Sequence, residues 1–458
     1  MSKFRRILAR TSIINRNLKP SRIIALSFIG IIMVGTILLA LPISSRNGNV
    51  TGLLTALFTA TSATCVTGIT IVDTYEYWSF FGQSVILVLI QIGGLGFMSF
   101  ISIFYFLLNR RVRLRERLVI MESMNLSSVE GVVALVQRVL KGTLIFESVG
   151  AVILSFCFIP EFGVAGGIWR GIFHSISAFC NAGFDIMGKH TLFSALETYI
   201  DNPVILLTLA ALIIVGSTGF YVWEDIITNR KFKKLHLNSK LALIITVTLI
   251  VLGMLMYMTF ESDNPNNMGN MDMGNKLLLS FFQSVSTRTT GFDVIGQSTL
   301  TEDTKILSML LMFVGGTSGS TAGGVKTVTI GILVISVIAN MRGKRDMVVF
   351  ERRIPHIQVI NATSLVFISI LITLLGGIFI STTNGANLIN SLFESVAAYS
   401  TAGMTTGLVK TINTASRLLM IFFMFFGKIG ILSLSIGFMT KGRKYRNYTY
   451  PEENVIIG

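Results

Sequence analysis

Residues 58–70, FTATSATCVTGIT, form a stretch that occurs in four related copies along the chain. The other copies are FHSISAFCNAGFD at 173–185, FFQSVSTRTTGFD at 281–293 and FESVAAYSTAGMT at 393–405, and they align without a gap. Each copy has a glycine ten residues after its first phenylalanine. Because internal repeats decide the architecture before local patterns do, the copies predict a pseudo-fourfold arrangement around a central axis.

A pair of glycines follows each copy at a similar distance. We expect each pair to lie on a hydrophobic helix. The pairs are Gly93/Gly96, Gly216/Gly219, Gly316/Gly319 and Gly427/Gly430.

The composition indicates an integral membrane protein. The chain has 458 residues, of which 52% are hydrophobic and 13% charged, whereas soluble domains carry roughly 25% charged residues. The first 23 residues are basic and precede an apolar run long enough to span, so no cleavable signal peptide is expected. Three cysteines are too few for a disulfide framework, and we expect Cys65, Cys157 and Cys180 to be buried thiols.

The net charge of +15 is concentrated rather than spread. This distribution is the positive-inside bias of a membrane protein and not a nucleic-acid-binding surface. It places both termini in the cytoplasm. Most of the lysines and arginines fall in the stretches 3–22, 110–117, 230–240, 342–353 and 441–446. The three middle stretches are also candidate docking surfaces for a cytoplasmic partner, although topology alone explains any one of them.

One copy lies between successive basic stretches, so each unit crosses outward and returns. We therefore predict an all-α membrane protein, with four helix–re-entrant loop–helix pseudo-repeats around a central pore. The repeats cover roughly 20–117, 118–235, 236–350 and 351–446 of a single domain, 1–458, with a tail at 447–458. All four units run in the same direction, which disfavours an inverted-repeat transporter.

Eight spanning helices and four half-helices are expected, the latter too short to span. The rising helices are 24–41, 132–159, 241–260 and 360–380. The half-helices are 53–60, 168–179, 277–286 and 388–398, and the returning helices are 80–108, 204–223, 306–341 and 418–439.

The backbone after each half-helix is the candidate ion-binding site. Irregular backbone at membrane depth must line water or be buried in protein, and rings of carbonyl oxygens replace the hydration shell in potassium filters. Asp185 and Asp293 would lie just outside this filter and concentrate cations. The alternative for the glycines is helix packing. The candidate filter residues are Val66, Thr67, Gly68, Asn181, Ala182, Gly183, Thr289, Thr290, Gly291, Thr401, Ala402 and Gly403.

The third returning segment, 306–341, is too long for one straight span. Fully helical, its residues would extend roughly 54 Å at about 1.5 Å per residue. Its middle is poor in helix formers and is expected to break the helix below the filter; the alternative is a close-packed helix interface. That middle is Gly315, Gly316, Thr317, Ser318, Gly319, Ser320, Thr321, Ala322, Gly323 and Gly324.

Two basic residues lie at membrane depth. Lys428 lies in the fourth returning helix, where a charge is costly and usually functional. Arg288 precedes the third filter glycine, and we interpret it as structural, paired with a buried carboxylate such as Glu394 or Glu147.

The fourfold plan and the stretches CVTG, NAGFD and RTTGF resemble the Trk/Ktr/HKT superfamily of potassium transporters, and most closely the KtrB group, the membrane subunits of bacterial Ktr uptake systems. The resemblance covers nearly the whole chain. It implies a potassium-selective pore in the bacterial cytoplasmic membrane, a homodimer, and a cytoplasmic ring of nucleotide-binding regulatory subunits. In that superfamily glycine at all four filter positions goes with potassium selectivity, and serine in the first goes with sodium permeation.

The resemblance also implies roles outside the filter. The glycine-rich segment 315–324 would be an intramembrane gate, with Lys428 beside it at a position where the family has arginine. Lysine keeps the charge and loses the planar fork. No ATP-binding motif lies in the chain, so no cofactor is expected here, K⁺ is the transported ion, and any nucleotide would act through the partner.

Two other functions stay open. A sodium-permeable or Na⁺/K⁺-cotransporting relative would share this plan, and the sequence does not decide whether Na⁺ is coupled. A membrane enzyme is disfavoured, because the four histidines are scattered and no HExxH motif or catalytic triad is present. A flux assay with both ions separates these functions.

Overall fold

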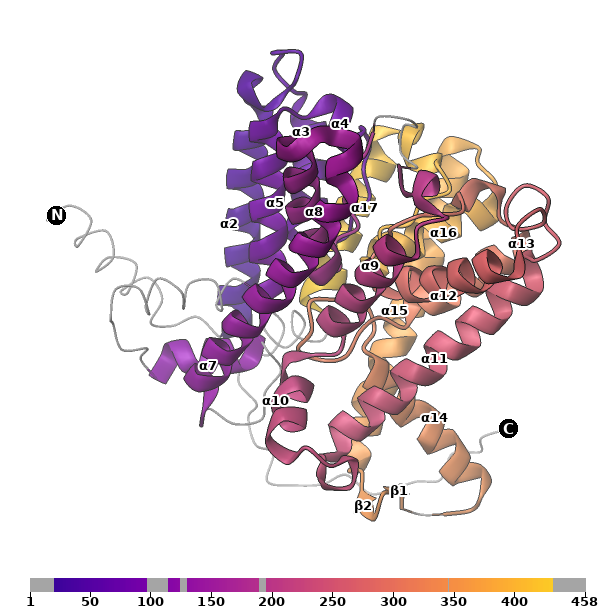
Figure 1. Ribbon diagram of the computed structural model, residues 1–458. Coiled ribbons are helices and arrows are strands. Elements are labelled where there is room, and N and C mark those ends of the chain that lie inside the picture. The colour runs from indigo at the N-terminus through magenta and orange to yellow at the C-terminus, as the bar shows by residue number, and fades with distance from the viewer. Residues whose placement is uncertain (1–19, 97–113, 124–129, 189–194, 345, 431–458) are drawn as a thin grey trace, which may run out of the picture.

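A computed structural model describes residues 20–96, 114–123, 130–188, 195–344 and 346–430 (Figure 1). Each repeat begins with a long apolar helix. These four helices are long and apolar enough to cross a membrane. They are α2 (Pro20–Ala40), the first part of α8 (Val132–Phe179), α11 (Leu237–Glu261) and α15 (His356–Asn384). Large apolar side chains are exposed along all of them, as expected for helices that face lipid.

A half-helix follows in every repeat, as predicted. In the second repeat it is the part of α8 after Gly163, whose φ of 73° breaks the helix next to Pro160. The other half-helices are α3 (Leu53–Thr64), α12 (Met273–Thr289) and α16 (Leu388–Ser400). The three separate half-helices each pack against their own rising helix. Within α8, Ser175 Oγ of the half-helix donates to the Glu147 carbonyl of the rising part.

The returning helices are shorter than predicted. The second of them, α9 (Pro203–Ser217), bends by 90° into α10 (Phe220–Asn229), and the third stops before its glycine-rich middle and resumes as α14 (Thr327–Met341). By length and composition the described residues therefore contain four possible spans, or five if α9 and α10 count as one, in place of eight. The remaining returning helices are α5 (Phe80–Leu95), α13 (Glu302–Phe313) and α17 (Thr414–Ile429). The predicted continuations of α5 and α17 lie outside the described residues.

The glycine pairs explain these breaks. We expected both glycines of a pair to lie on a helix, but the second glycine ends it with a positive φ in α5 at Gly96 (80°) and in α17 at Gly430 (89°), and Gly219 (92°) marks the α9–α10 bend. The first glycine lies where the helix crosses a half-helix end. A Cβ on Gly93, Gly216 or Gly427 would lie closer than 3.0 Å to a backbone carbonyl oxygen there.

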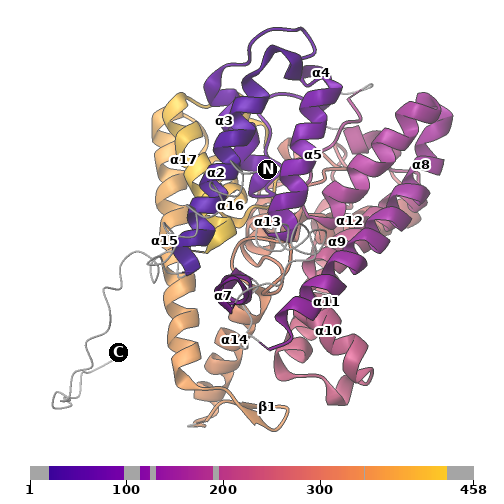
Figure 2. The ribbon, with the colours of Figure 1, turned by 90° about the vertical axis from the view of Figure 1, so that its left-hand side faces the viewer.

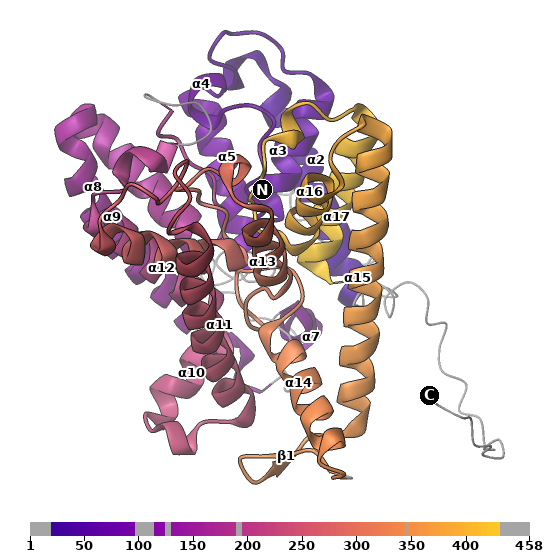
Figure 3. The ribbon, with the colours of Figure 1, turned by 90° about the vertical axis from the view of Figure 1, so that its right-hand side faces the viewer.

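The four repeats close into a ring. The returning helix of one repeat packs on the half-helix of the next, through α5 with α8, α9 with α12, and α13 with α16, and α17 closes the ring on α3. In Figure 2 α3 lies toward the end of the molecule that carries α4 (Thr74–Tyr77), and α16 and α12 lie nearer the middle of its height. At the opposite end lie α10 and the hairpin of β1 (Val348–Val349) and β2 (Arg352–Arg353) (Figure 3). This lower end carries the basic stretches 230–240 and 342–353, as expected for one face of the membrane.

Short elements complete the described chain. They are η2 (Pro42–Ser44), α7 (Leu114–Ser123), η3 (Ala195–Tyr199), η4 (Phe232–Lys234), η5 (Gln297–Thr299) and η6 (Leu408–Lys410).

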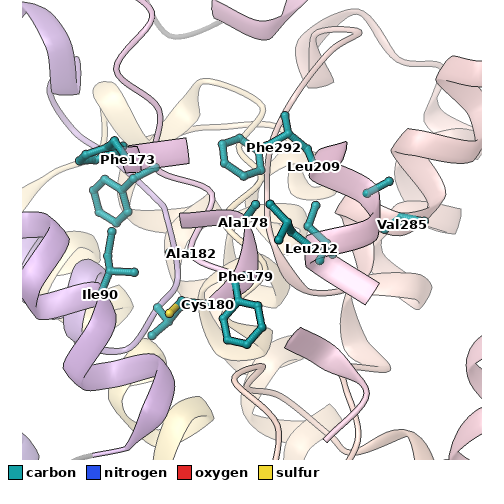
Figure 4. Close-up of a cluster of buried hydrophobic side chains, with 14 of the residues drawn as sticks. Ile90, Phe173, Ala178, Phe179, Cys180, Ala182, Leu209, Leu212, Val285 and Phe292 are labelled. Carbon is teal, nitrogen blue, oxygen red and sulfur yellow. The ribbon is translucent and has the colours of Figure 1, made fainter. Parts of the chain in front are cut away.

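The core surrounds the half-helix ends. Figure 4 shows Phe173, Phe179 and Cys180 of the second half-helix region packed with Ile90 of α5 and Leu212 of α9. The cysteines Cys65 and Cys180 are buried free thiols, as predicted, and Cys157 is a free thiol that is partly buried. Neighbouring repeats therefore share one hydrophobic core, which fixes the position of the irregular backbone between them.

Candidate functional site

The chain leaves three half-helices through a left-handed residue that is not glycine. Val66 (φ 57°), Asn181 (60°) and Thr401 (51°) all adopt this conformation, which is rare for β-branched residues. Such backbone costs about 1–3 kcal/mol per residue and persists where surrounding structure enforces it, often at functional sites. In the third copy α12 continues through the equivalent position, Thr289, so the left-handed residue is missing.

The four glycines of the copies then meet in a closed ring. All have positive φ, at Gly68 (88°), Gly183 (67°), Gly291 (90°) and Gly403 (79°). A Cβ on any of them would lie closer than 3.0 Å to the carbonyl oxygen that precedes the glycine of the next copy. Those oxygens belong, in chain order, to Ala182, Thr290, Ala402 and, closing the ring, Thr67. Only glycine fits this approach of backbone to backbone.

The ring opens into a cavity of about 120 Å³ on the side of α4. All four glycines line it, together with Asp185 and Asp293, so both carboxylates lie where the sequence predicts them. The Asp293 carboxylate accepts bonds from the backbone and side chain of Gln297, whereas Asp185 accepts one from the Met187 N–H. Burial, with a smaller contribution from Asp73, raises the pKa of Asp185 to about 7.

On the other side of the ring lies the glycine-rich segment. Residues 314–326 form an irregular loop between α13 and α14, so the predicted helix break is confirmed. Val314 and Val325 pair at its base, and the Gly315 N–H donates to the Val325 carbonyl (2.8 Å). Gly319 and Gly324 take positive φ within the loop. The segment is therefore a closed loop of backbone rather than a helix interface.

Neighbouring repeats hold this loop. The Thr317 N–H donates to the Ser217 carbonyl (3.0 Å), and the Phe220 N–H at the start of α10 donates to the Gly319 carbonyl (2.9 Å). On the opposite side the Gly324 N–H donates to the Gly427 carbonyl (3.2 Å). The loop thus attaches to the second repeat at the α9–α10 bend and to the fourth repeat at the end of α17.

Two ammonium groups contact the backbone of the loop, one from the fourth repeat and one from the loop itself. Lys428 Nζ donates to the Thr321 carbonyl, so this lysine contacts the loop as the sequence suggested. Lys326 Nζ donates to the Ala322 carbonyl (2.7 Å) and was not singled out from the sequence. It carries the same signal as Lys428, a cationic side chain within an apolar run.

The predicted ion pair of Arg288 is wrong for the described residues. Arg288 Nη2 faces the Gly315 carbonyl (3.4 Å), at the start of the loop. Glu394 instead accepts from Thr405 (2.6 Å) and Thr406, which follow the fourth filter glycine. The partner of Arg288 is thus a backbone carbonyl of its own repeat, which the spacing of charged residues in the sequence did not reveal.

The other proposed carboxylate, Glu147, lies behind the second copy. Gln91 Nε2 donates to both of its oxygens (3.1 and 3.2 Å), and Ser175 Oγ donates to its carbonyl (2.7 Å). Gln91 belongs to α5 of the first repeat. The carboxylate therefore ties α8 to the adjacent repeat and not to Arg288, and the backbone carbonyl of Glu147 bonds to its own half-helix.

Residues 14–447 match the sequence profile of the TrkH family, described as cation transport protein. The chain belongs to this family. It is 38% identical to the potassium/sodium uptake protein NtpJ of Enterococcus hirae, over 97% of this chain and 98% of that protein. It is 37% identical to the Ktr system potassium uptake protein B of Bacillus subtilis, over 96% and 97% of the two chains.

A solved member of the TrkH family shares the fold. The crystal structure of the potassium transporter TrkH from Vibrio parahaemolyticus superposes with a TM-score of 0.69, covering 92% of this chain and 86% of that one. The sequences are only 16% identical, so this likeness concerns the fold. The resemblance drawn from the repeated stretch is thereby confirmed at the level of family.

Proposed function

We propose that this chain takes up K⁺ across the bacterial cytoplasmic membrane as a multi-pass protein with both termini in the cytoplasm. The observation that carries the proposal is the closed ring of Gly68, Gly183, Gly291 and Gly403 against the preceding carbonyl of the next copy. Carbonyl oxygens at such a constriction can replace the water shell of a cation. The names of its relatives, potassium uptake proteins, support K⁺ as the substrate.

In this proposal the ring and the backbone before it, 66–68, 181–183, 289–291 and 401–403, form the selectivity filter. The ordered backbone contributes oxygens, and contact between the backbones of neighbouring copies holds the ring at one diameter. Asp185 and Asp293 on the outer cavity raise the local cation concentration. Each half-helix also directs the negative end of its dipole toward the ring, which favours cations.

The loop 315–324 is the proposed gate. It lies under the ring and is held by hydrogen bonds to two other repeats, so a change at either attachment moves it. Lys326 and Lys428 place positive charge beside the path of a cation and add an electrostatic barrier. Glycine lowers the cost of changing backbone angles in this segment.

Control is proposed to come from the cytoplasm. Helix α14 runs directly from the loop to the basic stretch 342–353, and α10 runs from the loop to 230–240. A partner docked on these stretches could shift either helix and bias a two-state loop. Relatives named as components of a Ktr system support such a partner; we propose a homodimer with a cytoplasmic nucleotide-binding ring.

Uptake by the purified chain in proteoliposomes tests the proposal. Radiolabelled rubidium and sodium are offered in separate arms, each against liposomes without protein. Rubidium uptake with little sodium uptake supports a K⁺-selective pore. Absence of rubidium uptake by folded protein, with and without the partner, contradicts it.

Sodium is the second candidate substrate. A relative at 38% identity is named a potassium/sodium uptake protein. Equal uptake of both ions in the same assay indicates a sodium-permeable pore. Rubidium uptake that requires sodium on the same side indicates Na⁺-dependent transport. The two outcomes are distinguished by offering each ion alone, because a sodium-permeable pore takes up either ion without the other.

A further inference from the structure

One filter residue contacts both the ring and the loop. Asn181 is fully buried and takes the position that Val66, Thr289 and Thr401 occupy in the other copies. Its Nδ2 donates to Thr289 Oγ1 (2.6 Å), in the third copy. Its Oδ1 accepts from Thr321 Oγ1 (3.0 Å), in the loop. A single amide group therefore joins two strands of the filter to the gate.

Thr321 is the corresponding contact on the loop. Its hydroxyl also lies 3.3 Å from the Phe179 carbonyl, and its N–H lies 3.4 Å from the Gly216 carbonyl, both in the second repeat. Its own carbonyl accepts from Lys428. Movement of the loop thus cannot leave the Asn181 amide undisturbed.

Backbone geometry alone does not account for asparagine at this position. Asn181 has a φ of 60°, and asparagine tolerates left-handed backbone better than most residues. However, Val66 and Thr401 adopt the same conformation at the equivalent positions although both are β-branched. The presence of asparagine at position 181 is therefore explained by the two hydrogen bonds of its amide and not by its left-handed backbone.

The third copy is the strand that depends on this bond. It lacks the left-handed residue of the other three, because α12 continues through Thr289. Its Thr289 side chain reaches Asn181 in the second copy and lies 3.4 Å from Thr290 Oγ1, next to Gly291. A change in the orientation of the Asn181 amide would reach the ring through this side chain.

We propose that Asn181 is a positioning residue that couples the loop to the selectivity filter. With the loop in place, Thr321 holds the Asn181 amide, and the amide holds the third filter strand. Loss of this contact removes a partner from the amide and loosens the strand, so ion selectivity depends on a loop residue as well as on the ring. Because coupling is reciprocal, an ion that fits the filter also favours the contact. This inference rests on the proposed function.

The test measures ion selectivity in a variant of Thr321, a loop residue that lies outside the filter. Thr321→Val keeps the shape of the side chain and removes the hydroxyl that donates a hydrogen bond to Asn181 Oδ1. We expect rubidium uptake to rise and the rubidium-to-sodium uptake ratio to fall by about fivefold, since roughly 1 kcal/mol is the size of one hydrogen bond. Ser320→Ala is the matched control, because the Ser320 hydroxyl donates to Thr317 within the loop (2.7 Å). It should change flux and leave the ratio at the wild-type value.

A double variant separates coupling from two independent effects. Asn181→Ala and Thr321→Val should each lower the ratio, and together they should lower it no further than Asn181→Ala alone. A wild-type ratio in folded Thr321→Val overturns the coupling. So does an equal loss of ratio in Ser320→Ala. If the wild-type chain takes up no rubidium, the proposed function fails; if it is selective and only the Thr321 result is negative, the coupling alone fails.

Discussion

The Cα of Gly68 lies against the carbonyl group of Ala182 in the next repeat, so closely that a Cβ would lie within 3.0 Å of the carbonyl oxygen. The same relationship recurs around the ring and returns from Gly403 to Thr67. The diameter of the constriction is therefore set by contact between backbones, with no side chain in between. Such a contact tolerates almost no added volume.

Gly68→Ser should admit sodium. Its φ of 88° is unfavourable for serine, and the added Cβ must push the Ala182 carbonyl out of place. The ring then no longer replaces the water shell of K⁺ better than that of Na⁺. The measurement is rubidium and sodium uptake in proteoliposomes, with Gly407→Ser as control. Gly407 also lines the outer cavity at positive φ but has no atom within 4 Å of its Cβ position. A wild-type ion preference in Gly68→Ser would exclude the first copy from the filter.

Gly427→Ala should destabilise the fold. The Cβ would overlap the carbonyl of Tyr399 at the end of α16, and both groups belong to backbone that cannot turn aside. Overpacking of this kind costs about 1–3 kcal/mol or more. The check is the midpoint of thermal unfolding in detergent. Gly30→Ala, on the exposed side of α2 with nothing within 4 Å, is the matched control and should leave the midpoint unchanged or raise it.

Uptake should depend on the outer pH through Asp185. Its pKa is raised to about 7, so the carboxyl is protonated and neutral below that pH and charged above it. The groups that share its cavity are Asp73, Asp293 and Lys410. At K⁺ concentrations below saturation, uptake should rise between about pH 6 and about pH 8. Asp185→Asn should flatten this rise, whereas Asp293→Asn should retain it. An unchanged profile in Asp185→Asn would assign the pH effect to another group.

The repeated stretch predicted most of the elements that form the ion path, but few of the contacts that hold the filter and the loop in place. Ungapped copies and basic stretches placed the half-helices and the break within 306–341, because both depend on local composition. The 90° bend at Gly219 was missed, since a glycine pair on an apolar run also fits a straight packed helix. The partner of Arg288 was assigned wrongly, because it is a backbone carbonyl of the same repeat and not a carboxylate. The Asn181–Thr321 contact was missed, because residues from different repeats meet there. A contact between side chains of different repeats has no characteristic residue spacing, so one sequence alone does not predict it.

Lys428→Ala should raise flux without loss of folding. The ammonium donates to the Thr321 carbonyl, so its removal both frees the loop and takes a positive charge away from the path. Lys428→Arg is the control, because it keeps the charge while changing the donor geometry. Rubidium uptake by folded protein is the readout, and flux at or below the wild-type level in Lys428→Ala would contradict a barrier at this position.

Deleting residues 317–322 should open the path and weaken control by a cytoplasmic partner. The deletion removes the loop's bonds to Ser217, to Gly216 and to the start of α10, and with them its connection to the second repeat. Rubidium uptake should therefore rise and change little when the regulatory ring is added. Because Thr321 is lost, the Asn181 amide also loses its partner, and the rubidium-to-sodium ratio should fall together with the rise in flux. A folded deletion variant with wild-type flux and wild-type regulation would show that the segment only packs between helices. Raised flux at an unchanged ratio would keep the gate and reject its coupling to the filter.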